Sequence, residues 1–311
     1  MGSVYSYLRS FFTSGTTSTS LETDRTAIFS PSPDAIQEVL RRMDLGGPLQ
    51  SCGRRVPAKC ELRDLGDGRL VKSGHTVSLA EARAMVFIRE RTSIPVPKIT
   101  MVFTYDSVVH IVMELVEGIT LTDAVLRKLI SSDDLHTVVV QLRDIIDTIR
   151  ALGRCTAHTE FGSWPIGPYT NTYFCDLRPA GPFHSVDEFH AYWLKVVDNT
   201  KYMADKPVSK ALQDVARRDA SSTATKAGPV LTHGDLAPRN IIVRNGLIVA
   251  VLDWEAFGWY PEFWETMGLR NGGLTVGLKS KLREVFGEEP DVAATYRYIL
   301  ASLDSPQAHY R

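Results

Sequence analysis

Hydrophobic and polar positions predict strands in two separate parts of the chain. Short apolar runs, rich in β-branched residues and bounded by Gly, Pro or charged residues, are typical of strands. Gly66-Asp67-Gly68 predicts a turn in the first part, and Asn245-Gly246 predicts a tight hairpin turn in the second. The predicted strand regions are 56–76, 99–104, 108–115, 230–232, 240–243 and 247–252.

Helical periodicity accounts for most of the remaining chain. The clearest case is 79–92, where apolar residues fall on or near one face and Ser78 is placed to cap the first turn. A shorter helix, capped by Ser32 or Asp34, is expected to run to about Met43. The other predicted helices cover about 121–130, 133–152, 185–199 and 207–219, with a Gly/Pro/aromatic interruption at 162–183. Further helices are expected after the strand at 247–252, up to the end.

The pattern changes from strand-rich to helix-rich near Glu117-Gly118. We therefore expect an α+β chain with a small strand-rich lobe over 31–117 and a larger helical lobe over 118–311. Residues 1–30 are expected to be a flexible leader, because 13–20 consist of small polar residues. At 311 residues the chain is long enough for two packed lobes.

Composition excludes several classes of function. The formal net charge of −1 and the scattered basic residues argue against a nucleic-acid binder. Four cysteines without CxxC spacing argue against a disulfide framework or zinc site, and they favour a cytoplasmic setting. No apolar stretch approaches the ~18 residues of a membrane-spanning helix. The first six residues, MGSVYS, fit an N-myristoylation pattern that also recurs by chance, and one acyl chain gives only weak, reversible membrane contact.

Residues 230–255, VLTHGDLAPRNIIVRNGLIVAVLDWE, carry the most informative chemistry. Asn240 follows Asp235 by five residues, which places both on one short loop, and a hairpin at Asn245-Gly246 would return Asp253 beside them. Phosphoryl transfer from a nucleotide needs a carboxylate at the acceptor hydroxyl, and oxygen ligands that hold Mg²⁺ against the phosphates. The segment therefore predicts kinase chemistry, with Asp235, Asn240 and Asp253 as the three polar groups at the reacting centre.

HGDLAPRNIIV followed by LDWE resembles the aminoglycoside phosphotransferase family, especially its large fungal branch. The resemblance is specific over about 60–268 and includes the segments 70–72, 81–82, 94–97, 112–118, 181–183 and 258–262. It implies a protein-kinase-like two-lobed fold, with a small β-rich nucleotide-binding N-lobe and a larger helical C-lobe that holds the catalytic loop and acceptor site. It also implies a kinase that moves the γ-phosphoryl group of Mg-ATP or Mg-GTP to a hydroxyl of a small acceptor.

The resemblance assigns roles by position. Asp235 resembles the family's catalytic aspartate, and Asn240 and Asp253 resemble its magnesium ligands.

The resemblance also assigns residues outside this segment. Lys72 resembles the lysine that pairs with the α- and β-phosphates, where a fixed positive charge is needed. Glu81, at the start of the following helix, is expected to hold Lys72 as an ion pair and so to belong to the catalytic set. Glu90, later on the same helix, is the rival partner.

Two nucleotide-binding segments are expected on position alone. Gly66 and Gly68 either cover the phosphates with backbone N–H groups or form a plain hairpin turn, because a G-x-G-x-x-G pattern would need glycine where Val71 stands. Backbone groups of a hinge are expected to meet the purine edge. The hinge residues are Met113, Glu114, Leu115 and Val116.

Three features near the motif have alternative interpretations. His233 is expected to hold the loop in shape rather than act as a base. Arg239 either contacts phosphate or substrate, or neutralises a carboxylate such as Glu255. The aromatic residues over 254–264 are expected to be core, the alternative being the wall of an acceptor pocket. Acidic residues near the C-terminus could meet a polycationic acceptor; they are Glu284, Glu288, Glu289, Asp291 and Asp304.

Other function classes remain open beside the kinase. HGD in place of HRD, and the lack of an APE motif, argue against a protein kinase. A nucleotide-binding pseudokinase or scaffold is a second hypothesis, although the four site residues Lys72, Asp235, Asn240 and Asp253 are intact. A third is a biosynthetic enzyme that couples phosphorylation to elimination. The acceptor, the choice of ATP or GTP and the oligomeric state do not follow from the sequence.

Overall fold

The computed structural model describes nine stretches of the chain, and the elements below lie within them. The first 26 residues, which include the acylation motif and most of the expected leader, lie outside the described part, as do Cys155 and Cys175. The described stretches are 27–46, 48–52, 60–154, 159–165, 167–174, 177–199, 206–220, 228–270 and 275–303.

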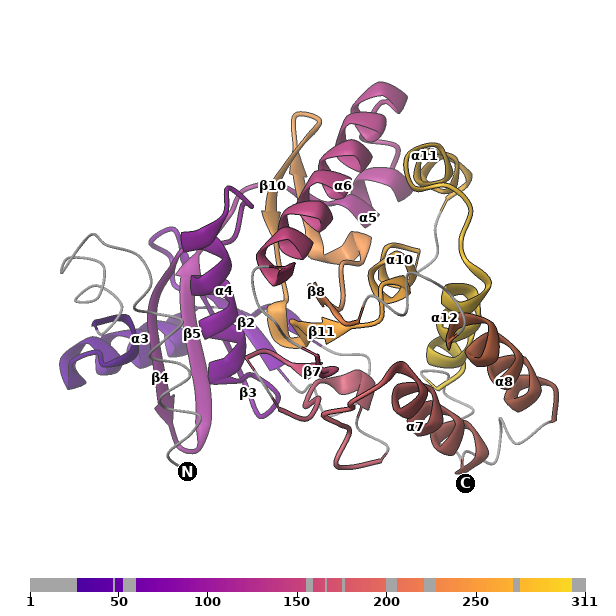
Figure 1. The fold of residues 1–311 in the computed structure, drawn as a ribbon. Coiled ribbons are helices and arrows are strands. Elements are labelled where there is room, and N and C mark those ends of the chain that lie inside the picture. Colours follow the sequence, from indigo (N-terminus) through magenta and orange to yellow (C-terminus); the bar gives the residue numbers. More distant parts are fainter. Residues whose placement is uncertain are drawn as a thin grey trace. The chain divides into compact units, whose positions relative to one another are not determined.

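Internal contacts divide the chain into two compact units (Figure 1). The first contains the residues up to Gly74 together with Ile99–Met113, and the second contains His75–Lys98 together with everything from Glu114 onward. The hinge segment expected from the sequence therefore lies where the chain passes from one unit to the other.

The first unit contains a five-stranded sheet, and helix α3 precedes this sheet along the chain. The strand order is β1-β2-β3-β5-β4, and the pairs β1–β2, β2–β3 and β4–β5 are antiparallel. Helix α3 begins after Ser32, whose hydroxyl accepts the backbone N–H of Ala35 as an N-cap. The elements are α3 (Pro33–Leu45), β1 (Pro48–Cys52), β2 (Cys60–Asp64), β3 (Arg69–Gly74), β4 (Ile99–Tyr105) and β5 (Val108–Glu114).

A small hydrophobic core holds α3 against this sheet. Val39 of α3 is buried with Val71 of β3, Phe103 of β4 and Val112 of β5. Because alternate residues of a strand point to opposite faces, these positions define the face that α3 covers.

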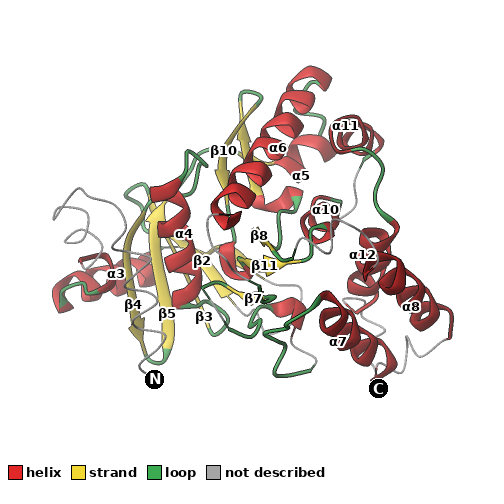
Figure 2. Ribbon diagram, in the orientation of Figure 1, coloured by secondary structure: helices red, strands yellow, loops and turns green. Residues whose placement is uncertain are grey.

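The second unit is mainly helical (Figure 2). Its longest helix, α6, packs against β8, β10 and α11, while α8 packs against α7 and α12. The helices are α4 (Leu79–Arg91), α5 (Leu121–Leu126), α6 (Ser132–Arg154), α7 (Val186–Asn199), α8 (Lys206–Ala220), α10 (Phe263–Leu269), α11 (Val276–Phe286) and α12 (Asp291–Leu303), with 3₁₀ turns η1 (Thr172–Phe174), η2 (Pro238–Asn240) and η3 (Trp254–Ala256). None of the described helices is long and apolar enough to cross a membrane.

Two three-stranded sheets position the loops of the second unit. Their strand orders are β10-β9-β6 and β7-β11-β8, and β11 pairs antiparallel with both of its neighbours. The strands are β6 (Ile119–Thr120), β7 (Gly162–Ser163), β8 (Val230–Thr232), β9 (Ile241–Arg244), β10 (Leu247–Val251) and β11 (Gly258–Tyr260).

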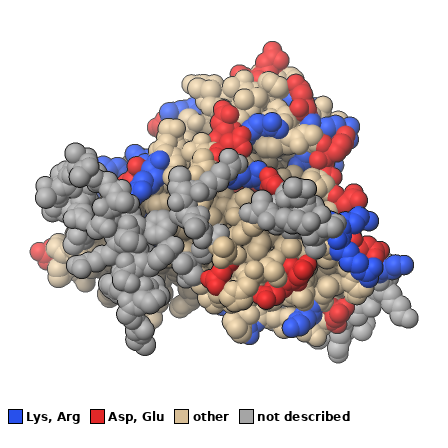
Figure 3. Space-filling view, in the orientation of Figure 1, with Lys and Arg blue, Asp and Glu red and all other residues tan. Residues whose placement is uncertain are grey.

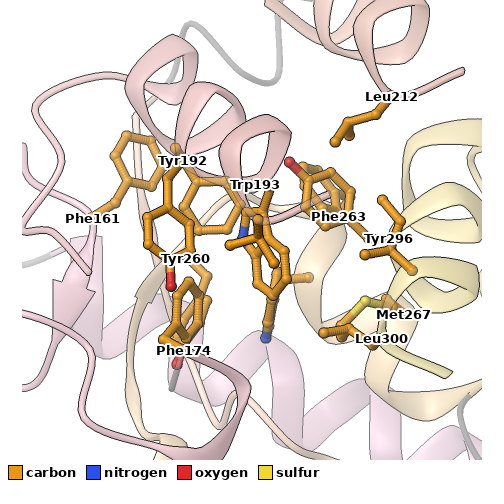
Figure 4. Packing of buried hydrophobic residues seen from close by; sticks show 14 of the residues in the cluster. Phe161, Phe174, Tyr192, Trp193, Leu212, Tyr260, Phe263, Met267, Tyr296 and Leu300 are labelled. Atoms are coloured by element: carbon orange, nitrogen blue, oxygen red, sulfur yellow. The ribbon is translucent and has the colours of Figure 1, made fainter. Parts of the chain in front are cut away.

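An aromatic core lies among the helices of the second unit (Figure 4). Trp193 of α7, Trp264 of α10 and Phe174 of η1 are fully buried, and their rings lie within about 6 Å of one another. Tyr296 of α12 packs on Trp264 and donates or accepts a hydrogen bond with His190 at 2.6 Å. Aromatic pairs at such distances add to the free energy gained by burial.

Most predicted elements are found at the expected positions, but helix α5 is shorter than predicted, and the short strands β1, β6, β7 and β11 lie outside the predicted strand regions. Helix α5 ends at Leu126 instead of 130, because Lys128 adopts a left-handed backbone conformation with φ of 56°. Strand β11 was not predicted. Its three residues, Gly258–Tyr260, are too few to show a period of two, and it exists through pairing with β7 and β8.

Candidate active site

Three short connections bring the predicted catalytic residues together. The predicted catalytic loop, residues 233–240, follows β8. Its last residue, Asn240, ends η2 directly before β9. β9 and β10 form a hairpin whose turn residues Asn245 and Gly246 have φ of 52° and 73°, as a type I′ turn requires. The backbone N–H of Leu252 donates to the carbonyl oxygen of Asn240 at 2.8 Å, so the next residue, Asp253, returns to the loop. The hairpin predicted from the sequence is confirmed.

Asp235 is buried and accepts hydrogen bonds from three side chains. The Tyr173 hydroxyl donates to Oδ1 at 2.6 Å, and the Asn240 amide donates to Oδ2 at 2.9 Å. Arg239 Nη2 lies 2.7 Å from Oδ1 and 2.5 Å from Oδ2. The carboxylate is only 6% exposed, so its orientation is set by these three partners.

The electrostatic environment of Asp235 combines opposing effects. Burial raises the pKa of Asp235, and the negative charge of Asp253 raises it further, whereas Arg239 and Tyr173 act to lower it. Burial also raises the pKa of Tyr173 well above its usual value, so its hydroxyl stays protonated and donates. The influence of Asp253 on Asp235 places two carboxylates close together, which is where a cation is expected to bind.

His233 braces the loop through both ring nitrogens, as expected. Its Nε2 donates to the carbonyl oxygen of Leu252 at 3.0 Å, and its Nδ1 accepts the backbone N–H of Asp235 at 3.2 Å. One donor and one acceptor describe a neutral imidazole. The ring is fully buried against Trp254, so His233 links the catalytic loop to the end of β10.

Position 234 of this loop accommodates only glycine. Its φ is +87°, and a Cβ there would lie 2.3 Å from the carbonyl oxygen of Ala256. The loop is therefore packed directly on η3 without room for a side chain.

We expect Gly234→Ala to lower the free energy of unfolding by about 3 kcal/mol, because strain and a backbone clash add. Gly277→Ala is the matched control, since a Cβ on Gly277 in α11 meets nothing within 4 Å. Urea denaturation should show a large loss for Gly234→Ala and no loss for the control. Equal effects of the two changes would contradict the close packing on η3.

Glu265, on α10, lies beneath the catalytic loop and holds its backbone. Its Oε2 accepts the backbone N–H of His233 at 2.7 Å, and the amides of Gly234 and Leu236 also favour its charged form. Burial opposes this and raises the pKa of Glu265 to about 7. Trp264, the preceding residue, donates its indole N–H to the carbonyl oxygen of Gly234 at 3.0 Å. Helix α10 thus supports the loop from below.

The raised pKa of Glu265 predicts a pH dependence of stability. A carboxyl group with a folded pKa above its unfolded value stabilises the fold fully below the unfolded value, and this contribution is lost as pH rises through the folded value. Between its ordinary pKa of 4.5 and about 7, we expect the contribution of Glu265 to fall by about 3 kcal/mol. The difference in unfolding free energy between wild type and Glu265→Gln should change over this interval. A constant difference from pH 4.5 to 7.5 would contradict the buried, titrating carboxyl group.

Asn240 and Asp253 fit a magnesium ion. The amide nitrogen of Asn240 donates to the carbonyl oxygen and Oδ2 of Asp235, which leaves its Oδ1 to face another group. Asp253 is half-buried at the end of β10, in a left-handed conformation with φ of 65°. Within the described ranges, no three or more His, Cys, Asp or Glu side chains gather as a metal site. Two protein oxygen ligands suit Mg²⁺, which usually keeps several waters.

Lys72 and Glu81 are both buried, each in its own unit. Lys72 lies on β3 and is 7% exposed, while Glu81 occupies the first turn of α4 and is 2% exposed. Glu90, the rival partner, is exposed. A buried carboxylate requires a partner, so Glu81 is the better candidate of the two. The pairing of Lys72 with Glu81 stays a prediction.

The conformation of the β2–β3 turn accounts for its two glycines without a bound ligand. Gly66 and Gly68 have φ of 74° and 81°, and Asp64 Oδ1 accepts the backbone N–H of Gly66 at 2.8 Å. Asp67, between them, pairs with Arg69 at 2.6 Å and with Arg42 of α3 at 2.8 Å. A role of this turn over phosphates stays a prediction.

In the expected hinge, Met113 is buried at the end of β5 and Leu115 is exposed. The backbone N–H of Glu114 donates to the carbonyl oxygen of Lys98 at 3.0 Å, and the backbone N–H of Lys98 donates to Glu114 Oε1 at 2.9 Å. Val116, which follows, is half-buried. The contact of this segment with a purine stays a prediction.

The contacts bear on two open alternatives near the motif. Arg239 pairs with a neighbouring carboxylate, Asp235, as the neutralising interpretation expects, while its contact with phosphate or substrate stays a prediction. The aromatic residues are core, as the packing interpretation predicts, since every one is at most 6% exposed: Trp254, Phe257, Trp259, Tyr260, Phe263 and Trp264.

Acidic residues near the C-terminus already have basic partners. Glu289 pairs with Arg297 through two hydrogen bonds of 3.0 and 2.9 Å. Across the face in Figure 3, acidic and basic side chains of the described chain lie interspersed. The remaining pairs are Glu284 with Lys281, Glu288 with Arg283, and Asp291 with Arg218, while Asp304 lies outside the described residues.

Sequence reasoning missed two residues that contact the loop, Tyr173 and Glu265. Tyr173 lies in the irregular 162–183 segment, where no periodic pattern marks a function. Glu265 directly follows Phe263 and Trp264 in GWYPEFWE, and an acid next to two large aromatic residues was a signal that a buried carboxylate has a polar task.

Comparisons with known proteins agree with this geometry. The family model described as "Phosphotransferase enzyme family" (APH) matches residues 69–269. Hygromycin-B 4-O-kinase of Escherichia coli is 23% identical over 167 residues, a match that spans 52% of this chain but only 43% of that relative.

Solved structures show the same fold. Aminoglycoside phosphotransferase APH(4)-Ia, in a ternary complex with ADP and hygromycin B, superposes with a TM-score of 0.53 at 16% identity, over 82% of each chain. ADP-bound APH(2'')-Ib gives a TM-score of 0.54 at 12% identity, over 90% of this chain and 93% of that one. The protein has the protein-kinase-like fold of these enzymes, and it belongs to the phosphotransferase enzyme family.

Proposed function

We propose that the protein is a small-molecule kinase that moves the γ-phosphoryl group of a magnesium-bound nucleotide, ATP or GTP, onto an acceptor hydroxyl. The observation that carries this proposal is the meeting of Asp235, Asn240 and Asp253 at the ends of β8, η2 and β10. One carboxylate and two further oxygen ligands on adjoining loops are what phosphoryl transfer requires.

In this proposal Asp235 orients the acceptor hydroxyl and receives its proton. The hydroxyl oxygen forms a bond to the γ-phosphorus, the bond to the β–γ bridging oxygen breaks, and the nucleoside diphosphate leaves with that electron pair. Asn240 Oδ1 and the Asp253 carboxylate would hold Mg²⁺, which offsets the charge of the phosphates when bound. Lys72, positioned by Glu81, binds the α- and β-phosphates, and the β2–β3 turn and hinge complete the nucleotide site.

The acceptor is a small hydroxyl compound. The solved relatives bind aminoglycosides, and such polycations need a carboxylate-rich surface. The candidate carboxylates of α11 and of the connection between α11 and α12 are paired with Arg or Lys in this structure. An acceptor screen should therefore cover neutral polyols and monocations as fully as polycations.

Incubation with Mg-ATP and a panel of hydroxyl compounds, followed by mass spectrometry, tests the activity. A product heavier by one phosphate supports the kinase. Loss of water from the acceptor would instead support phosphorylation coupled to elimination. Nucleotide binding without turnover on any acceptor would support a pseudokinase or scaffold.

Finer assignments belong to the same proposal. The HGDLAPRN and LDWE motifs support membership of the fungal-type branch of the family. We also propose a nucleotide lobe over 31–117 and a catalytic lobe over 118–311, and a cytoplasmic setting supported by the sparse cysteines.

A further inference from the structure

We propose that Tyr173 is a positioning residue for the reaction, whose hydroxyl fixes the orientation of the Asp235 carboxylate. The proposal rests on the function proposed above for Asp235. Its starting observation is the 2.6 Å hydrogen bond from the Tyr173 hydroxyl to Asp235 Oδ1, made by residues 62 positions apart in the sequence.

The segment that carries Tyr173 is held in place by packing in the aromatic core. Phe174, the next residue, is fully buried in the aromatic core (Figure 4). Its ring stacks on that of Tyr169 at 4.1 Å and on that of Trp264 at 5.6 Å. The Tyr173 ring itself lies edge-on to Trp264, with ring centroids 6.1 Å apart. Since Trp264 also bonds the carbonyl oxygen of Gly234, one side chain supports both partners of the contact.

A buried amide fixes the backbone of the same segment. Asn171 is 4% exposed; its Oδ1 accepts the backbone N–H of Tyr173 at 3.1 Å, and its Nδ2 donates to the Tyr260 hydroxyl at 3.0 Å. The Tyr260 hydroxyl in turn donates to the carbonyl oxygen of Ala256 at 2.8 Å. A continuous chain of hydrogen bonds thus joins Tyr173 to η3, which directly follows Asp253.

Among the partners of Asp235, Tyr173 is held in place by buried neighbours, and Arg239 is the adjustable one. The Arg239 side chain is 47% exposed and spans both carboxylate oxygens from a single nitrogen. A carboxylate has about four acceptor positions, so an incoming hydroxyl has to share or replace one donor. The half-exposed, flexible guanidinium of Arg239 is displaced from Asp235 more readily than the hydroxyl of Tyr173, whose neighbours are buried. Tyr173 therefore keeps the Asp235 carboxylate in a fixed orientation while the acceptor binds.

Tyr173→Phe removes the hydroxyl and leaves the ring in the core. With Mg-ATP as substrate and water as the acceptor, release of labelled phosphate should show a kcat about 10-fold lower and an unchanged KM for ATP. Asn171→Ala, which touches nothing on Asp235, should lower kcat in the same direction. Tyr298→Phe is the control, because Tyr298 is 59% exposed on α12, and it should match wild type.

The contact itself has a signature that needs no activity. A buried tyrosine hydroxyl bonded to a carboxylate exchanges slowly with water, so proton NMR should show a downfield hydroxyl resonance in wild type. This resonance should be absent from Tyr173→Phe and from Asp235→Asn, and present in Tyr298→Phe. Its absence from the wild-type spectrum would overturn the proposal.

If Tyr173→Phe kept the kcat of wild type, or changed only the KM for ATP, this result would also exclude the positioning role. Failure of the proposed kinase function would look different. Wild type would then bind no non-hydrolysable ATP analogue and release no phosphate, and the hydroxyl resonance alone would decide whether Tyr173 holds Asp235.

Discussion

Asp235→Asn is expected to lower turnover by about 10²- to 10⁴-fold while nucleotide binding is kept. Asparagine has nearly the shape of aspartate, but its amide cannot take the proton of the acceptor hydroxyl. It also loses the ion pair with Arg239, whose Nη2 lies 2.5 Å from Asp235 Oδ2. The measurement is steady-state turnover of Mg-ATP beside calorimetric titration with a non-hydrolysable analogue.

A matched control separates this effect from general damage to the loop. Asp123, which caps the start of α5 together with Thr120, is exposed and far from the motif in sequence. Asp123→Asn should leave turnover within about twofold of wild type. Turnover that survives Asp235→Asn, with the protein folded, would exclude Asp235 as the catalytic carboxylate.

Glu265→Ala is expected to cost about 3 kcal/mol of folding free energy and most of the activity. The change leaves the buried backbone N–H of His233 without its acceptor, and it opens a cavity beneath the catalytic loop. Because the loop carries Asp235, its loosening should lower kcat more than the loss of stability alone explains. Denaturation curves and turnover of the same preparation provide the measurement.

Glu265→Gln is the informative partner of this change, since an amide oxygen can still accept the N–H of His233. We expect it to retain most of the activity and stability that Glu265→Ala loses. A Gln variant as inactive as the Ala variant, at a pH where both are folded, would contradict a purely structural role. Glu262→Ala is a further control, because Glu262 pairs with Arg150 at the surface.

The local parts of the site could be predicted from sequence, because they depend on neighbours along the chain. The spacing from Asp235 to Asn240 and the Asn245-Gly246 turn fix the return of Asp253, and the structure has this hairpin. Ser78 at the start of α4 shows the same locality, since its hydroxyl accepts the N–H of Glu81 at 3.2 Å. Turns and helix caps depend on interactions over a few residues, so they can be predicted from a single sequence.

The supporting parts of the site could not be predicted, because they depend on tertiary packing. Tyr173 reaches Asp235 only after η1 docks into the aromatic core, and its own segment lacks a period. Glu265 needs α10 to lie beneath the loop, 32 residues from His233. Contacts of this range follow from the assembled core, not from local pattern.

The most direct test of the kinase proposal is calorimetric titration of the protein with a non-hydrolysable ATP analogue, with and without Mg²⁺, beside Asp253→Ala. We expect binding that depends on Mg²⁺ in wild type, and a clear loss of that dependence in Asp253→Ala with the fold intact. If the protein bound neither ATP nor GTP analogues with or without Mg²⁺, the fold would be that of a phosphotransferase but the proposed function would be wrong.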